Sequence, residues 1–129
     1  MDAGTMINLE IKLMKYMLLM YANESDQTKL TPEELQELQH AWFSYMQEAK
    51  AAGVLVDNNG LAPVTNATTV RVREGKTLTT DGPFAETHEQ LAGFSLLECQ
   101  NLDDAIGWAT RIPMARFGSV EIRPLWDQV

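Results

Sequence analysis

The chain has one cysteine and no long apolar run, and each shortage excludes a class of protein. Cys99 has no second cysteine with which to form an internal disulfide, so nothing indicates an oxidising compartment. No apolar stretch approaches the length of a membrane span, and the chain does not begin with the basic and apolar regions of a signal peptide. We therefore expect a cytoplasmic protein of bacterial type with no membrane partner.

Basic residues are also scarce. Ten Lys and Arg residues stand against eighteen Asp and Glu residues, which gives a formal net charge of −8. Phosphate contacts need clustered cations, so this balance argues against nucleic-acid binding.

The short motifs of several enzyme classes are absent as well. The sequence has no P-loop, no G-x-G-x-x-G, no G-x-S-x-G and no metal-type spacing of Cys and His. His88 with Glu86 and Glu89 offers metal-ligand types, but neighbouring side chains on a short helix point apart. We expect neither a metal nor a cofactor.

What is present is typical of one globular α+β domain. Of the 129 residues 45% are hydrophobic and 22% are charged. Hydrophobic periodicity predicts the order strand, long helix, strand, hairpin, strand, helix, strand. The predicted strands are residues 16–21, 54–56, 68–73, 77–80, 91–99 and 119–123. Residues 23–29 are predicted as a loop and residues 57–60 as a turn.

Both helices carry local start signals. Thr31 as N-cap, Pro32 at the first helical position and Glu34 as the partner of a capping box predict a long helix that Gly53 ends. Asn101 is the predicted N-cap of the second helix. Its predicted inner face consists of Leu102, Ala105, Ile106, Ala109 and Ile112.

Without the hairpin, this order is the β-α-β-β-α-β arrangement of a ferredoxin-like fold. Two helices on one face of an antiparallel sheet leave the other face uncovered, and apolar residues there need a partner. A second copy of the sheet is the simplest cover, so we expect a homodimer.

Folding alone does not account for residues 81–90. Pro83 stiffens a turn that ends in the large ring of Phe84, and Asp81, Glu86 and Glu89 lie close to the imidazole of His88. Acids on a rigid loop beside a core strand are suited to proton transfer. A second interpretation is a plain turn followed by a solvated first turn of helix, where acids suit the helix dipole.

The run from Asp81 to Glu89, DGPFAETHE, resembles the signature of the DGPF subgroup of the YCII-related family, which usually has Lys at the position of His88. The likeness covers roughly residues 14–125. It continues through residues 67–73, 93–94, 102–105 and 118–124. The resemblance implies a ferredoxin-like α+β domain with an inserted β-hairpin that pairs into a dimeric α/β barrel.

The extent of the likeness places the domain at residues 14–125, followed by a tail at 126–129. Residues 1–13 are then an N-terminal extension, either an alternative start or a cloning remnant. Apolar residues alternate with polar ones over residues 7–11, which is compatible with a short added strand.

Other branches of the family carry a His on the long helix, thought to pair with an Asp as a catalytic dyad. The matching position here holds Trp42, so the role does not transfer to His40. The chemistry guessed for those relatives is therefore weakly supported in this chain.

Seven residues form the predicted site. Asp81 and Glu86 are the candidates for proton transfer. Arg71 and Arg73 share one side of a predicted strand, either as a clamp for an anion or as charges that protect a sheet edge. The predicted aromatic ligand contacts are Phe84, Trp42 and Tyr21.

Two functions remain open from the sequence. The first is a dimeric barrel that binds a small molecule, with acid/base chemistry at the loop. The second is a non-catalytic regulatory or accessory domain, since family members often resemble accessory proteins of extracytoplasmic-function sigma factors. In the second case Asp81 and Pro83 serve loop geometry alone.

Overall fold

Strand β1 (Met14–Ala22) lies inside a four-stranded antiparallel sheet and pairs with β5 (Gln90–Cys99) and β6 (Ser119–Pro124). Strand β2 (Leu55–Gly60) pairs with the other edge of β5, so the strand order is β2-β5-β1-β6. The computed structural model describes residues 12–129, so the strand suggested for residues 7–11 lies outside it. The order is compatible with a ferredoxin-like α+β fold.

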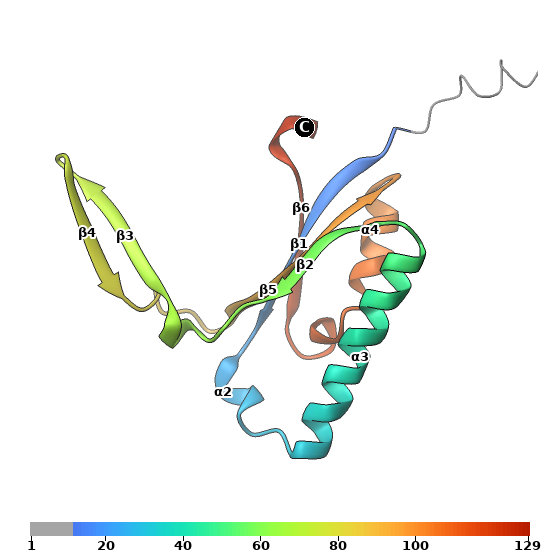
Figure 1. The fold of residues 1–129 in the computed structure, drawn as a ribbon, viewed down its shortest axis with the longest axis horizontal. Coiled ribbons are helices and arrows are strands. Elements are labelled where there is room, and N and C mark those ends of the chain that lie inside the picture. The colour runs from blue at the N-terminus through green and yellow to red at the C-terminus, as the bar shows by residue number, and fades with distance from the viewer. Residues whose placement is uncertain (1–11) are drawn as a thin grey trace, which may run out of the picture.

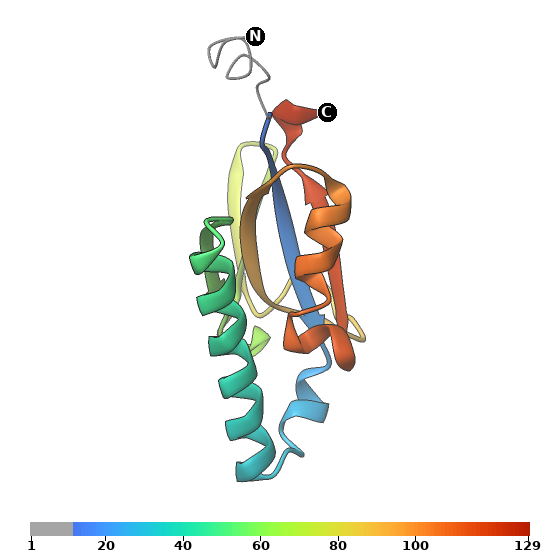
Figure 2. The same ribbon diagram turned by 90° about the vertical axis from the view of Figure 1, so that its right-hand side faces the viewer.

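Two helices cover one face of the sheet, and a hairpin lies on the other side (Figures 1 and 2). The helices are α3 (Pro32–Ala51) and α4 (Leu102–Ala109), and a short α2 (Glu24–Gln27) follows β1. The hairpin joins β3 (Thr68–Arg73) to β4 (Lys76–Asp81) as a separate two-stranded sheet. No helix within residues 12–129 is long and apolar enough to span a bilayer.

The capping signals are confirmed. The Thr31 hydroxyl accepts from the amide of Glu34 at 3.1 Å, and the Glu34 carboxylate accepts from the amide of Thr31 at 3.2 Å. The Asn101 side chain accepts from the amide of Asp104 at 2.9 Å at the start of α4. Gly53, with φ of 74°, follows the end of α3 as predicted.

The core lies between the sheet and the two helices. Tyr16, Leu18 and Met20 alternate along β1 and are buried, while the residues between them face the other side. Tyr45 of α3 is also buried, and its hydroxyl lies 2.8 Å from the hydroxyl of Ser95. Burial raises the pKa of Tyr45, and the hydrogen bond with Ser95 partly opposes that rise.

Three local expectations need correction. Residues 57–60, predicted as a turn, belong to β2, because Asn58 and Gly60 pair with Ser95 and Gly93 of β5. The loop predicted at residues 23–29 contains α2. Leu102 and Ile106, predicted on the inner face of α4, are exposed, since this short helix buries only Ala105 and Ala109.

The face of the sheet opposite the helices has a central apolar strip with no cover within residues 12–129. Charged and polar residues flank this strip: Glu121 and Arg123 of β6 lie opposite Leu19 and Met17, and Asp57 and Asn59 of β2 lie opposite Leu96 and Phe94. Met17 and Leu19 of β1 lie opposite Leu96 and Phe94 of β5, and all four are partly buried by one another. We call this surface the open face. The C-terminal tail, residues 126–129, lies beside this face, and its Trp126 is 90% exposed.

Replacing Thr31 by Ala is expected to lower the free energy of unfolding by about 1 kcal/mol, because the amide of Glu34 loses its acceptor. Urea unfolding followed by circular dichroism measures this change. Thr31→Ser is the matched control, since it keeps the hydroxyl and should retain most of the stability. Equal loss in both variants would contradict the capping role.

Candidate functional site

The loop between β4 and β5, residues 82–89, is tied at its first end to the hairpin. The amide of Gly82 donates to the carbonyl of Ala67 at 2.7 Å. The Thr69 hydroxyl donates to the carbonyl of Gly82 at 2.9 Å. The Arg71 guanidinium donates to the carbonyl of Phe84 at 3.5 Å. These contacts come from one side of β3, so that side of the strand positions the loop.

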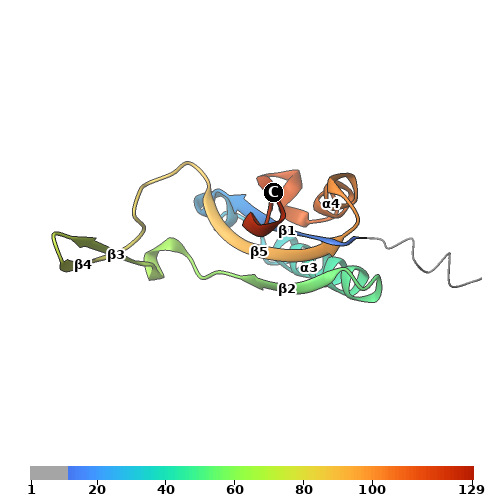
Figure 3. The same ribbon diagram turned by 90° about the horizontal axis from the view of Figure 1, so that it is seen from above.

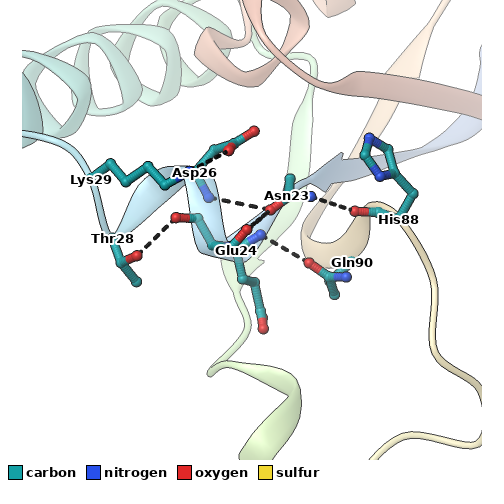
Figure 4. Close-up of polar contacts among 8 residues, drawn as sticks. Asn23, Glu24, Asp26, Thr28, Lys29, His88 and Gln90 are labelled. Atoms are coloured by element: carbon teal, nitrogen blue, oxygen red, sulfur yellow. Dashed lines mark hydrogen bonds and ion pairs between the residues drawn. The ribbon is translucent and has the colours of Figure 1, made fainter.

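The second end of the loop is tied to α2 (Figure 4). The Asn23 side-chain amide donates to the carbonyl of His88 at 2.9 Å, while the Asn23 side-chain oxygen caps α2 by accepting from the amides of Ser25 and Asp26. The Gln90 side chain accepts from the amide of Glu24 at 2.9 Å. The turn after β1 therefore holds the end of a loop that lies 65 residues away in the sequence.

Residues 84–89 form no helix, so the interpretation of Glu86 and Glu89 as a first helical turn is wrong. In a helix these loop carbonyls would accept hydrogen bonds from backbone amides of the next turn, but here they accept them from side chains. Gln90 donates to the carbonyl of Thr87 at 2.6 Å, and Asn23 donates to that of His88. The His88 imidazole points away from these contacts (Figure 4).

A hollow of about 630 Å³ lies between this loop and the end of the sheet. Its walls are mainly apolar, and its polar groups include two carboxylates. The Glu89 carboxylate accepts from the Ser119 hydroxyl at 2.9 Å, whereas Glu86 has no hydrogen-bond or ion-pair partner within residues 12–129. The lining residues are Tyr21, Val64, Pro83, Phe84, Ala85, Glu86, Thr87, Glu89, Gln90 and Leu91.

The hollow has acids but no Lys, Arg or His among its lining residues. Apolar walls with a few placed polar groups are typical of small-molecule sites. Carboxylates attract cations and hydrogen-bond donors. The arrangement therefore suits a ligand that combines an apolar part with an amine or another donor group.

Three of the predicted site residues come together at this hollow. Tyr21, Phe84 and Glu86 all line it, and Phe84 is 76% exposed at its edge. The aromatic pair joins the end of β1 to the loop. The sequence gave no reason to expect these three residues at one hollow.

The hairpin residues of the predicted site lie outside the hollow lining. Arg73 donates to the carbonyl of Val72 on its own strand at 3.0 Å. Asp81 pairs with Thr68 across the hairpin, whereas Arg71 pairs with Leu78. Side chains alternate along a strand, so Asp81 and Arg71 lie on opposite faces of the hairpin and do not form a common site.

Trp42 lies in a different place. Its ring stacks on Tyr45 with centroids 5.5 Å apart, and it lines a separate cavity of about 210 Å³ between α3 and the sheet. Met20 and Met114 contribute to the walls of that cavity. The predicted ligand contacts are therefore divided between two hollows.

Sequence reasoning missed Asn23, Gln90 and Val64. Asn23 followed by two acids within four residues is a typical helix start, so that pattern could have revealed α2. The hydrogen bond from Asn23 to His88 could not be predicted from neighbouring residues, because the two are 65 residues apart. Within residues 12–129 no group of three His, Cys, Asp or Glu residues is placed to hold a metal.

The fold and the hollow together define a small α+β domain whose loop 82–89 borders a candidate ligand site. Sequence comparison gives its family: the YCII-related domain matches residues 14–128, so the chain belongs to the YCII-related family. It is also similar to an uncharacterized protein of Rhizobium meliloti (strain 1021), with 39% identity over 114 residues. That alignment covers 87% of this chain and 92% of the relative.

The two roles of Asn23 can be separated by substitution. Asn23→Asp keeps the oxygen that caps α2 but loses the amide donor to His88, whereas Asn23→Ala loses both. We expect both variants to lower the NMR order parameters of residues 84–89, because the loop loses a tether. Only Asn23→Ala should also destabilise α2, by about 1 kcal/mol. Unchanged order parameters in both variants would contradict the tether.

Proposed function

We propose that this YCII-related protein binds a small organic molecule in the hollow beside loop 82–89. The observation that carries the proposal is a preformed hollow of about 630 Å³, within the roughly 300–1,000 Å³ range of ligand pockets. The ligand has an apolar part, which contacts Tyr21 and Phe84, and a donor group, which the carboxylates accept.

Glu86 is the residue that we propose for proton transfer. Glu86 is among the residues that line the hollow, and its carboxylate has no partner within the described chain, which supports this role. Glu89 is less suited, because Ser119 already donates to it. Asp81 is a second candidate in the proposal, but it lies outside the lining of the hollow within one subunit.

The proposal includes a homodimer that pairs two sheets into an α/β barrel. Its support is the open face, where Leu19 and Phe94 lie together without a cover from residues 12–129. The exposed ring of Trp126 extends this apolar surface at its edge. We also propose membership of the DGPF subgroup, on the DGPFAETHE run, and a cytoplasmic location.

One observation favours a second candidate function, a non-catalytic regulatory or accessory domain. Phe84 is 76% exposed, and exposed aromatic rings are typical of protein-binding surfaces. In that case the loop contacts a partner protein and Glu86 has no chemical role.

A ligand screen by NMR, with small amines and hydroxyl compounds that carry an apolar part, tests the first function. We expect Phe84→Ala to weaken binding by about tenfold, because it removes an aromatic wall. Glu86→Gln should weaken amine binding and abolish any turnover that the parent shows.

Asp81→Asn is the matched comparison for Glu86→Gln, because it neutralises a nearby acid outside the hollow lining. Unchanged binding and turnover in Asp81→Asn would remove Asp81 from the mechanism. Unchanged binding in Phe84→Ala and Glu86→Gln would contradict the assignment of the hollow.

The dimer makes a separate prediction. Leu19→Lys places a charge in the open face and is expected to shift the protein to monomer in sedimentation equilibrium, because burying a charge between two sheets costs more than an ion pair with the neighbouring Glu121 returns. Phe43→Lys is the control, since Phe43 is 53% exposed on α3, on the helix side of the sheet. A parent protein that is monomeric at all concentrations would contradict the homodimer.

A further inference from the structure

Two segments of the chain connect the four-stranded sheet to the hairpin (Figures 1 and 3). The first leads from β2 through a short 3-10 helix, η1 (Val64–Asn66), to β3. The second is loop 82–89, which returns from β4 to β5. Both segments line the hollow, because Val64 of the first and most of the second are among its wall residues. The shape of the hollow therefore depends on how η1 is held relative to the loop.

Backbone hydrogen bonds hold the first segment only at its two ends. At the hairpin end the amide of Gly82 donates to the carbonyl of Ala67, and at the sheet end the amide of Leu61 donates to the carbonyl of Ala92 at 2.8 Å. Within residues 12–129 the backbone bonds of η1 itself stay inside residues 63–67. The part of the segment that contributes Val64 to the hollow thus needs a tie from a side chain.

Glu24 of α2 supplies that tie. The amide of Val64 donates to the Glu24 carboxylate, with its nitrogen 3.1 and 3.2 Å from the two oxygens. The amide of Glu24 donates to the Gln90 side chain, whose nitrogen donates to the carbonyl of Thr87 (Figure 4). Val64, Gln90 and Thr87 all line the hollow, whereas Glu24 does not. One residue outside the hollow is therefore bonded, directly or through Gln90, to both of the segments that border it.

We propose that Glu24 is a positioning residue for the ligand site. Its carboxylate fixes Val64 in the wall, and its amide fixes the end of the loop through Gln90. An ionised acceptor forms a stronger hydrogen bond than a neutral one, which suits a carboxylate to holding this segment. A wall held before binding has less ordering cost when a ligand enters. The inference rests on the proposed function, since it takes the hollow as the ligand site.

The first test measures the tie without any ligand, as the hydrogen–deuterium exchange rate of the Val64 amide by NMR. Glu24→Ala should raise that rate by about tenfold, because the amide loses its acceptor. Glu24→Gln keeps a side-chain oxygen and should restore most of the protection. Asp26→Ala is the matched control, since Asp26 is the other acid in the first turn of α2 and pairs with Lys29 instead. Unchanged exchange in Glu24→Ala would overturn the tie.

The second test is NMR titration with two probes that share an apolar ring, benzylamine and benzyl alcohol. Glu24→Ala should weaken both by the same factor, about fivefold, because it loosens a wall and removes no group that lines the hollow. Glu24→Gln should recover most of the affinity for both probes. A loss confined to benzylamine would show a direct charge contact and would overturn the positioning role.

Phe84→Ala separates failure of this inference from failure of the proposed function. Weaker binding in Phe84→Ala with parental binding in Glu24→Ala would overturn the positioning role and leave the hollow as the site. Parental binding in both variants would overturn the hollow as the site and the positioning role with it. In either case the exchange rate of the Val64 amide still decides whether Glu24 ties η1 to α2.

Discussion

A sheet with helices on one face only is the constraint on which the rest of the structure depends. Strand β1 shows its effect residue by residue: Leu18 and Met20 are buried under the helices, while Leu19 and Tyr21 face the other way. Half of the strand therefore builds the core, and the other half, which includes Met17 and Leu19, faces away from the helices. The hollow begins at the end of this surface, so the open face and the candidate site meet at Tyr21.

The loop beside the hollow is held by side chains from distant segments. Arg71 reaches the carbonyl of Phe84 from the hairpin, and Asn23 reaches the carbonyl of His88 from the turn after β1. Each bond satisfies a loop carbonyl, so the loop keeps its shape without a helix or strand of its own. A loop held in this way has little conformational freedom left to lose.

The sequence predicts the parts of this fold that depend on neighbouring residues. The capping box of Thr31 and Glu34 is a local signal, and so is the continuous apolar run over residues 16–21 that predicts β1; both are confirmed. Residues 57–60 were mispredicted because their pairing with β5 overrides their turn propensity. The candidate site divides in the same way. The run DGPFAETHE marked the loop in the sequence. The separation of Asp81 from Arg71 depends on the hairpin register, and the meeting of Tyr21 with Phe84 depends on the folded chain, so neither could be predicted.

The central proposal is that a second copy of the chain covers the open face. The most direct measurement is the accessible surface of Leu19, Phe94 and Tyr21 in a crystal structure of the full chain. The account predicts a two-fold pair in which Leu19 and Phe94 are buried against the partner sheet. A structure in which the open face is in contact with solvent in every copy would contradict it.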